Sequence, residues 1–159
     1  MKYYCTIKTP VGTLIIVEEN NALTNIDLLD EICMEELLNG GGQEKSTPLL
    51  DRAVNQLKDY FAGFLRDFDL PLAPKGTDFQ KKDWAALCEV PYGETVTYKD
   101  IAVRIGCPKG PRAVGLANNR NPIMIVIPCH RVIGSDGSLV GYGGGLHIKE
   151  YLLKLEGVR

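Results

Sequence analysis

The chain has 159 residues, of which 45% are hydrophobic and 24% are charged, an ordinary composition for a globular protein. This length suits one domain, or two small domains that share an interface. The N-terminal residues lack the apolar segment and cleavage signal of a secretory peptide, and no apolar run approaches the roughly 18 residues of a membrane span. We therefore expect no membrane partner and a cytoplasmic location.

The formal net charge of −2 is distributed unevenly along the chain. Residues 1–78 contain 7 Lys and Arg against 13 Asp and Glu, a net of −6, whereas residues 79–159 contain 11 against 7, a net of +4. A localised basic face is what nucleic-acid binding requires, but ordinary surface variation also produces an excess of this size. Charge therefore permits DNA binding by the second half without establishing it.

The cysteines and histidines argue against disulfides and metal sites. Five cysteines lie scattered at positions 5, 33, 88, 107 and 129, with no CxxC pair and no disulfide-like framework. The two histidines, His130 and His147, form no pair with the spacing of a zinc finger. We expect a reducing compartment and no structural metal.

The first half has the pattern of a small α/β domain. Strand-like segments come first, then a short helix, and then a second helix whose start is marked by a capping hydroxyl and a proline at Thr47-Pro48. The expected elements are strands at 3–8, 13–17 and 23–28 and helices at 31–38 and 48–62, the last with an apolar stripe at Leu50, Val54, Leu57 and Phe61. Because Pro71, Pro74 and Gly76 punctuate a linker, we place two domains at 1–76 and 77–159.

The second half is expected to be mostly helical. Thr77 with Gln80 and Thr97 with Asp100 form capping-box patterns, each of which predicts a helix start. The helix after Thr97 should end near Gly106, and a further helix should begin between positions 109 and 112. Two short helices joined by a turn indicate a helix-turn-helix, although many proteins that do not bind DNA contain such a pair.

The last part of the chain has three further patterns. Residues 132–140 are expected to form a hairpin around Ser135-Asp136-Gly137. A glycine-rich segment follows, which either lets a ligand approach the backbone closely or serves as a flexible connector. Residues 146–156 are expected to form a final helix that Gly157 ends, with inward-facing residues at Ile148, Tyr151, Leu152 and Leu155.

The tetrapeptide Pro128–Arg131, PCHR in one-letter code, is the most informative motif. It follows the apolar run 123–127, so Cys129 lies at the end of a buried segment with an imidazole next to it. A thiolate beside a base is an activated nucleophile. A cysteine after an apolar run is also a common small core residue, and the dipeptide alone leaves both readings open.

Several motifs together resemble the O6-alkylguanine-DNA alkyltransferase family over residues 77–157. The active-site signature matches at 128–132 and 141–146, the first helix of the helix-turn-helix at 91–106, the recognition helix at Arg112-Ala113-Val114-Gly115, and the hinge at 118–123. The resemblance implies an α+β fold: a small N-terminal α/β domain with a mostly antiparallel, ribonuclease-H-like sheet, then a helical, winged helix-turn-helix-like domain that carries the active-site cysteine.

The resemblance also implies a set of site residues. Cys129 would be the nucleophile, losing its proton to His130 through a water, and Glu156 would orient the imidazole. Asn121 would hold the hinge near Cys129, and Tyr98 would donate a proton to the leaving guanine. The implied residues that contact DNA or the base are Arg112, Ala113, Gly115, Arg131, Val132, Tyr142 and Gly143. Arg112 would occupy the space of the flipped nucleotide, whereas its alternative role is a phosphate contact or a solvated charge.

The implied partner is double-stranded DNA that contains O6-alkylguanine and, as a second substrate, O4-alkylthymine. Transfer of the alkyl group to Cys129 would leave a thioether, so each protein molecule would act once, as a monomer and without a cofactor. Two departures from the family pattern leave the reactive residues untouched. Asp83 stands where an apolar residue is usual, which is expected to alter local packing. Gly110-Pro111 precedes Arg112 where small helix formers are more common, so the recognition helix is expected to start later.

Three alternatives remain testable. A damage-binding protein of the same fold would lack the cysteine, which this chain retains. A cysteine hydrolase would need an oxyanion hole and would turn over. A transcription regulator would form a stable complex with a specific operator.

Overall fold

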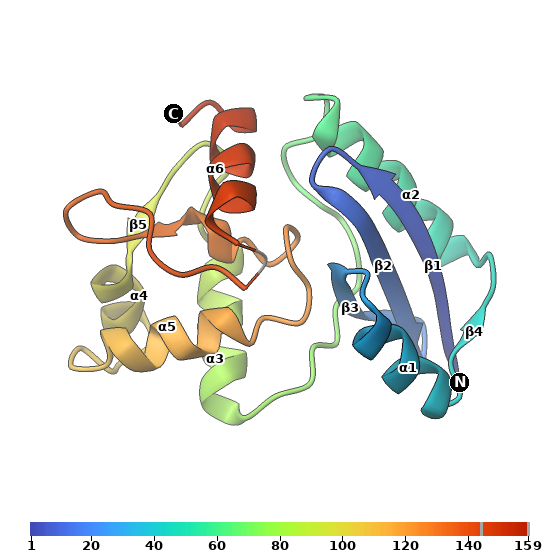
Figure 1. Ribbon diagram of the computed structural model, residues 1–159. Coiled ribbons are helices and arrows are strands. Elements are labelled where there is room, and N and C mark those ends of the chain that lie inside the picture. The colour runs from blue at the N-terminus through green and yellow to red at the C-terminus, as the bar shows by residue number, and fades with distance from the viewer. Residues whose placement is uncertain (144, 159) are drawn as a thin grey trace. The chain divides into compact units, whose positions relative to one another are not determined.

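The computed structural model describes residues 1–143 and 145–158 and divides into two compact units, Met1–Pro74 and Lys75–Arg159. Figure 1 colours the first unit blue to green and the second from yellow-green to red. The first unit contains the sheet, and the second is mostly helical. This arrangement confirms the predicted α+β class.

The first unit is a four-stranded sheet with two helices. Its elements are β1 (Lys2–Thr9), β2 (Gly12–Glu19), β3 (Ala22–Leu28), α1 (Glu31–Asn39), β4 (Gln43–Glu44) and α2 (Pro48–Phe61). The strand order is β3-β2-β1-β4; β1, β2 and β3 pair antiparallel, whereas β4 pairs parallel with β1. The sheet is therefore mostly antiparallel, as predicted.

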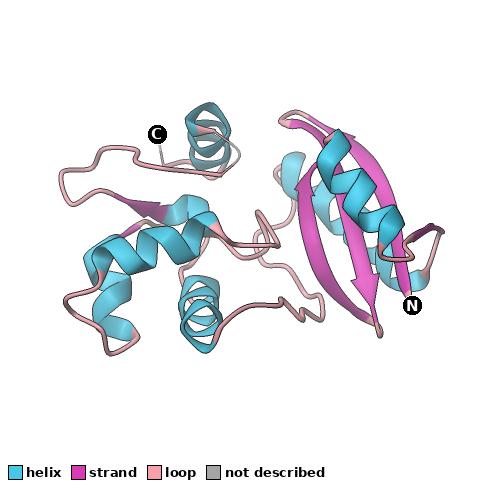
Figure 2. Cartoon of the chain, turned by 60° about the horizontal axis from the view of Figure 1, so that its bottom comes forward, coloured by secondary structure: helices cyan, strands magenta, loops and turns pink. Residues whose placement is uncertain are grey.

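The central strand β2 is buried on both faces. Its run Leu14 to Val17 has almost no exposed surface, because α1 and α2 lie on opposite faces of the sheet (Figure 2). On the α1 face, Ile15 and Val17 join a cluster with Tyr4 and Leu37. Strands covered on both sides have continuous apolar runs rather than alternating ones, which accounts for the sequence of β2.

The apolar side of α2 differs from the predicted stripe. Thr47 caps the helix as predicted, since its hydroxyl accepts a hydrogen bond from Leu50 N at 3.0 Å. Leu50 and Leu57 are buried, but the other two buried positions are Ala53 and Tyr60 rather than Val54 and Phe61. The buried side of α2 therefore follows positions 50, 53, 57 and 60, which are three or four residues apart. The predicted stripe left out the small Ala53 and the hydroxyl-bearing Tyr60.

The second unit contains four helices, one 3-10 turn and a two-stranded sheet among its described residues. Its elements are α3 (Asp78–Cys88), β5 (Val96–Thr97), α4 (Tyr98–Arg104), α5 (Pro111–Asn119), η1 (Cys129–Arg131), β6 (Val132–Ile133) and α6 (Leu146–Leu155). Helices α3, α4 and α5 pack against one another, and α6 packs against η1. The turn η1, which carries Cys129, contacts both α6 and α3.

Both predicted capping boxes are present. Thr77 accepts from Gln80 N at 3.1 Å and donates its own backbone N–H to the Gln80 side chain at 3.0 Å. Thr97 and Asp100 make the same reciprocal pair at the start of α4. Helix α5 begins at Pro111, a residue suited to the first helical position because its missing N–H would have no partner there.

The predicted hairpin over 132–140 is wrong. The turn exists, since Gly134 N donates to Ser138 O at 2.9 Å, but the segment after it is not a strand. Val132–Ile133 instead pairs in parallel with Val96–Thr97. The loop after the turn instead contacts α4, where the Tyr98 hydroxyl donates a hydrogen bond to Val140 O at 2.7 Å.

The final helix α6 also departs from the predicted inward face. Ile148 and Leu152 are buried as predicted, but Tyr151 is 38% exposed, and Lys149 is fully buried. Gly157 adopts a left-handed φ of 82° just after the helix, as expected of a C-terminal glycine.

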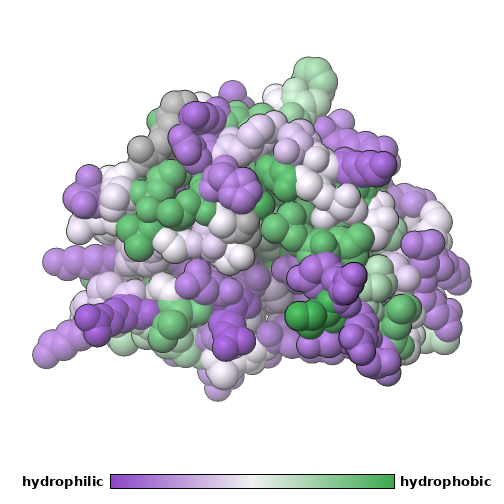
Figure 3. Space-filling view, viewed as in Figure 1, coloured by the Kyte–Doolittle hydropathy of each residue, from purple (hydrophilic) through white to green (hydrophobic). Residues whose placement is uncertain are grey.

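Most of the surface is polar, with apolar patches between charged side chains (Figure 3). The large apolar side chains that reach solvent include Ile32 and Phe64 in the first unit and Leu116 and Val140 in the second. Within residues 1–143 and 145–158, none of the helices combines the length and apolarity needed to cross a bilayer.

Candidate active site

Cys129 lies at the end of a buried, turn-rich segment rather than a strand. Residues 123–125 and 127 are buried, and turns are tightened by hydrogen bonds such as Val126 N to Met124 O at 2.8 Å. Ile125 has a left-handed φ of 73°, which is unfavourable for a β-branched residue. Strain of this kind persists where the surrounding packing fixes the backbone, and it is frequent at functional sites.

Asn121 ties the thiol to this segment. Its side-chain nitrogen donates to Ile127 O at 2.8 Å and lies 3.3 Å from the Cys129 sulfur, while its oxygen accepts from Ile123 N at 3.0 Å. The asparagine therefore fixes both ends of the turn that leads to Cys129. This places Asn121 at the thiol, where the resemblance expected it.

The Cys129 thiol is only 7% exposed, and burial raises its pKa to about 11. The hydrogen bond from Asn121 and the charge of Lys149 act in the opposite direction and lower that pKa. A thiol in this state is a weak nucleophile at neutral pH, so it needs a base to react.

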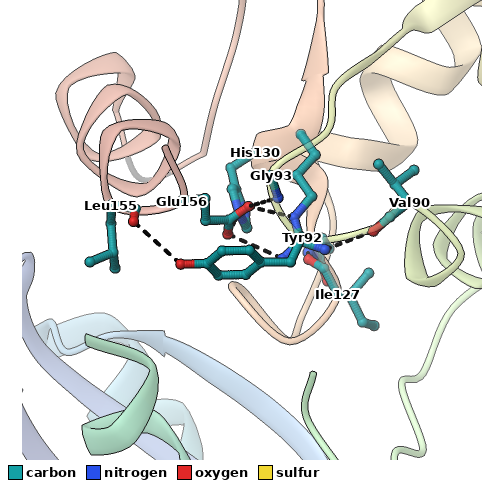
Figure 4. A network of polar contacts seen from close by, with 9 residues as sticks. Val90, Tyr92, Gly93, Ile127, His130, Leu155 and Glu156 are labelled. Atoms are coloured by element: carbon teal, nitrogen blue, oxygen red, sulfur yellow. Dashed lines mark hydrogen bonds and ion pairs between the residues drawn. The ribbon is translucent and has the colours of Figure 1, made fainter. Parts of the chain in front are cut away.

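His130 is fully buried and is bound by the Glu156 carboxylate. The imidazole Nε2 lies 2.7 Å from Glu156 Oε2, and both side chains have no exposed surface (Figure 4). Burial lowers the pKa of His130, an effect that Glu156 opposes. Among the described residues, His130 Nδ1 has no protein hydrogen-bond partner. The neutral imidazole is thus held in place from one side with its second nitrogen available.

Glu156 is the centre of a wider buried network. It accepts from Arg131 Nε at 2.8 Å, from Arg131 Nη2 at 3.1 Å and from Gly93 N at 3.4 Å. Tyr92 lies beside it and donates its hydroxyl to Leu155 O at 3.3 Å (Figure 4). A bidentate arginine is the strongest hydrogen-bonding partner that a carboxylate has in proteins, so Glu156 has a fixed position.

The position of Arg131 argues against the DNA contact predicted for it. Its guanidinium is 7% exposed, pairs with Glu156 and donates from Nη1 to Val90 O at 2.7 Å. A side chain engaged in this way faces the protein interior. Arg131 therefore holds Glu156 in position, and its guanidinium is directed to buried acceptors rather than to solvent.

Tyr98 and Lys149 share one backbone acceptor near the thiol. The Tyr98 hydroxyl donates to Val140 O at 2.7 Å, and Lys149 Nζ donates to the same oxygen at 3.0 Å. The Lys149 ammonium lies 5.8 Å from the centre of the Tyr98 ring. Burial raises the pKa of Tyr98, and the charge on Cys129 raises it further. The hydroxyl is therefore protonated and close to the nucleophile.

A cavity of about 500 Å³ opens beside Tyr98. Its walls come from α4, α5 and the loop before α6, and the lining residues include Tyr98, Arg112, Gly115, Asn119, Ser135 and Val140. Gly115 lies against the Tyr98 ring, since a Cβ there would be 3.7 Å from a ring carbon. The cavity thus lies between Tyr98 and the part of α5 that carries Arg112 and Gly115.

The remaining predicted residues lie around this cavity or below it. Arg112 is exposed on α5, Ala113 is half-buried, and Val132 is fully buried in β6. Tyr142 is half-buried and Gly143 is exposed in the loop before α6. The structure therefore brings together the thiol, the imidazole and Tyr98, and it leaves Arg112 free to contact a partner.

The sequence did not predict the burial of two charged side chains, Lys149 and Asp83, both of which are fully buried. A lysine at one position of a helix gives no sign that a backbone oxygen from another segment will accept its ammonium. For Asp83, the signal in the sequence was its departure from the family pattern, which was expected to alter local packing.

The arrangement fits nucleophilic chemistry by a thiol. A thiol that can act as a nucleophile, an imidazole that can act as a base and a carboxylate that orients the imidazole follow the logic of a catalytic triad. Among the residues that the structure describes, no three His, Cys, Asp or Glu side chains gather in a way that could hold a metal ion.

Two protein-family models match the chain. The model described as 6-O-methylguanine DNA methyltransferase, DNA binding domain, matches residues 78–158. The model described as 6-O-methylguanine DNA methyltransferase, ribonuclease-like domain, matches residues 2–74. Between them they cover nearly the whole chain.

Curated proteins and solved structures are similar over the same range. A methylated-DNA–protein-cysteine methyltransferase of Methanosarcina barkeri is 55% identical, covering 97% of this chain and 96% of its own. A constitutive methylated-DNA–protein-cysteine methyltransferase of Bacillus subtilis is 48% identical, with coverage of 98% and 96%. The crystal structure of Mycobacterium tuberculosis OGT in complex with DNA has a TM-score of 0.88 at 46% identity, covering 97% of this chain and 92% of that chain.

Proposed function

The chain belongs to the 6-O-methylguanine DNA methyltransferase family, and we propose that it transfers the alkyl group of O6-alkylguanine to Cys129 once and irreversibly. Its activity is that of a methylated-DNA–protein-cysteine methyltransferase, so it repairs DNA by alkyl transfer and has DNA as its partner. The observation that carries the proposal is the buried His130–Glu156 pair directly after the buried thiol of Cys129 in the chain.

The first step is removal of the thiol proton. With a pKa of about 11, roughly one Cys129 thiol in ten thousand is ionised at pH 7. Because burial keeps His130 neutral and Glu156 holds its Nε2, the Nδ1 atom is the proton acceptor. A bridging water carries the proton from the sulfur to Nδ1. The Glu156 carboxylate then stabilises the imidazolium.

The second step is an in-line substitution at the alkyl carbon. The thiolate of Cys129 forms the carbon–sulfur bond while the bond from that carbon to O6 of guanine breaks. The electron pair of the broken bond goes to guanine, which takes a proton from the Tyr98 hydroxyl. Tyr98 then regains its proton from the His130 imidazolium, and the charges balance. Tyr98 must exchange Val140 O for the base as its acceptor.

The damaged nucleotide has to leave the duplex to reach the thiol. Inside the stack the alkyl carbon is not open to in-line attack, and flipping a nucleotide costs a few kcal/mol. The cavity beside Tyr98 receives the flipped base. Tyr142 and the Gly143 backbone N–H, from the loop before α6, would bind the base, and the backbone carbonyls of Cys129 and Val132 would accept hydrogen bonds from the guanine amino group.

The recognition helix contacts the minor groove. Exposed Arg112 enters the space that the nucleotide leaves, and the 70% exposed Leu116 on the same helix adds an apolar contact. Ala113 and Gly115 keep the α5 surface small enough to approach the backbone of DNA. Binding at this helix would depend on salt, because it replaces counterions on the phosphates.

The product explains why the protein acts once. A thiolate bound to an alkyl carbon is a poor leaving group at neutral pH, so the alkyl group stays on Cys129. O4-alkylthymine presents an alkyl group on a comparable exocyclic oxygen and is a second substrate. The protein works as a monomer in the cytoplasm, where its five free cysteines stay reduced.

A titration tests this proposal. A fixed amount of protein is mixed with increasing amounts of a duplex that holds one O6-methylguanine, and restored guanine is counted by chromatography of the digested DNA. We expect a plateau at one repaired base per protein molecule, and no repair by a Cys129→Ser variant that still binds the duplex. Repair that continues beyond one base per protein would contradict the single transfer, and lesion binding without repair would contradict the chemistry.

A further inference from the structure

Asp83 is a fully buried carboxyl group that the mechanism above does not use. It lies in the middle of α3, immediately before Trp84, and has no exposed surface. Carboxylates are almost never buried to this extent unless a partner compensates for the lost hydration. The hydrogen-bonding partner of Asp83 and its place in α3 therefore indicate the role of this carboxyl group.

The partner is Asn118 at the end of α5. Asn118 satisfies its surroundings when its amide nitrogen faces α3; it then donates to Asp83 Oδ2 at 2.6 Å, to Asp83 Oδ1 at 3.2 Å and to Val114 O at 3.1 Å. The neighbouring residues make a parallel connection, because Trp84 Nε1 donates to Ala117 O at 2.9 Å. Two adjacent residues of α3 thus hold two adjacent residues of α5.

This connection leads directly to the reactive sulfur. Asn118 is three residues before Asn121, whose amide nitrogen lies 3.3 Å from Cys129 Sγ, and the Asn121 backbone N–H donates to Asn118 O at 3.1 Å. Helix α3 also packs against η1, which carries Cys129. The Asp83–Asn118 pair therefore fixes the end of α5 from which Asn121 reaches the thiol.

The Asp83 carboxylate also acts on the thiol through its charge. Burial is the main cause of the raised Cys129 pKa, and the negative charge of Asp83 raises it further, whereas Lys149 lowers it. Burial in turn raises the pKa of Asp83 itself to about 7. Asp83 therefore changes its charge close to neutral pH.

Few other charges face Asp83 from the elements packed against α3. The charged side chains of α4 and α5 are exposed, and Arg131 of η1 is paired with Glu156. Among the described residues of these elements, this leaves the half-buried Tyr98 and the buried Cys129 and His130 as titratable neighbours. No cation on these elements neutralises the Asp83 carboxylate, so its field reaches the site.

We propose that Asp83 is a positioning residue that restrains Cys129: its hydrogen bond with Asn118 holds the Asn121 turn in place, and its charge disfavours the thiolate. The proposal rests on the proposed role of Cys129 as the alkyl acceptor. Its consequence is that the free protein is protected from stray electrophiles, because the thiol becomes reactive only when a bound substrate places an alkyl carbon at the sulfur and His130 removes the proton.

The test compares wild-type protein with Asp83→Asn, which keeps the shape of the side chain and one acceptor oxygen for Asn118 and removes the charge. Alkylation of Cys129 by iodoacetamide is followed from pH 6 to pH 9 by peptide mass mapping, which separates Cys129 from the other four cysteines. The exchanged double variant Asp83→Asn with Asn118→Asp returns one carboxylate to the pair and serves as the matched control.

We expect Asp83→Asn to react faster than wild type above pH 7, by about threefold to tenfold, the range that a change of up to one unit in a pKa produces. The two rates should converge below pH 6, where Asp83 is protonated in wild type. The exchanged double variant should return to the wild-type profile. Equal pH profiles for wild type and Asp83→Asn would overturn the proposal.

A second variant covers the case in which Asp83→Asn does not fold. Replacing both partners by leucine, Asp83→Leu with Asn118→Leu, removes the charge without leaving an unpaired polar group, and such replacements of a buried pair are commonly tolerated. The same acceleration is expected there, and its absence would overturn the charge effect. Because iodoacetamide needs no DNA, these rates are measurable even if the protein fails to repair O6-methylguanine, so the two proposals fail separately.

Discussion

Replacing Glu156 by glutamine tests the network around His130. The substitution preserves the size of the side chain but leaves the guanidinium of Arg131 buried without a counter-ion, since its Nε and Nη2 both donate to this carboxylate, at 2.8 and 3.1 Å. Breaking a buried pair from one side destabilises proteins by about 3–5 kcal/mol. At about 2–4 °C per kcal/mol for a chain of this size, the melting temperature should fall by about 6–20 °C.

The assay is thermal and urea unfolding of wild type, Glu156→Gln and the double variant Glu156→Leu with Arg131→Met. The double variant removes both charges, so it should regain most of the lost stability while alkyl transfer stays impaired, because His130 has lost its anchor at Nε2. If Glu156→Gln melted within about 2 °C of wild type, or if the double variant were no more stable than Glu156→Gln, the network would not have the role assigned to it.

The variants Arg112→Ala, Lys149→Met and Asp83→Asn separate binding, chemistry and stability. Arg112→Ala should slow repair of duplex DNA by tenfold or more, about 1.4 kcal/mol or more, and leave the rate of reaction with free O6-benzylguanine unchanged. The control Arg66→Ala, in the first unit, should change neither rate. Equal losses on both substrates would contradict the DNA role of Arg112. Lys149→Met removes a positive charge that lowers the pKa of the Cys129 thiol. The plot of reaction rate against pH with O6-benzylguanine should therefore move to higher pH in this variant. An unmoved curve would exclude an effect of Lys149 on the pKa of the thiol. Burial raises the pKa of Asp83 from its ordinary 3.8 to about 7. Between pH 3.8 and pH 7 the folded state therefore binds more protons than the unfolded state, so the stability of wild type falls as pH rises through this range. Asp83→Asn should therefore gain stability over wild type by up to about 4 kcal/mol between pH 4 and pH 7.5 in urea titrations, and a constant difference across this range would contradict the shifted pKa.

Local signals in the sequence predicted the elements that local energetics determine. The capping boxes at Thr77 and Thr97 are satisfied within three residues of chain, so they form as predicted wherever the helix packs. The strands of the first unit follow equally from short apolar segments bounded by turns. The approach of Glu156 to His130 was expected from the family resemblance, and the 2.7 Å contact bears out that approach.

Features that depend on long-range packing could not be predicted from the sequence. The strand at Val132 pairs with Val96, 36 positions earlier, rather than with the segment after the turn. Lys149 is buried because Val140 O accepts its ammonium, and Ile125 holds a left-handed φ because the turn before Cys129 is fixed by Asn121. Val132 and Lys149 each pair with a residue outside their own element, so tertiary contacts override local preference there. The backbone strain at Ile125 is likewise fixed by the packing around it.

The most direct test of the central claim is the mass of the protein after one incubation with a duplex that contains a single O6-methylguanine. The account predicts a gain of one methyl group per molecule, located by peptide mapping on Cys129 and absent in Cys129→Ala. An unchanged mass despite repaired DNA, or a methyl group on Cys5, Cys33, Cys88 or Cys107, would contradict the assignment of Cys129 as the acceptor.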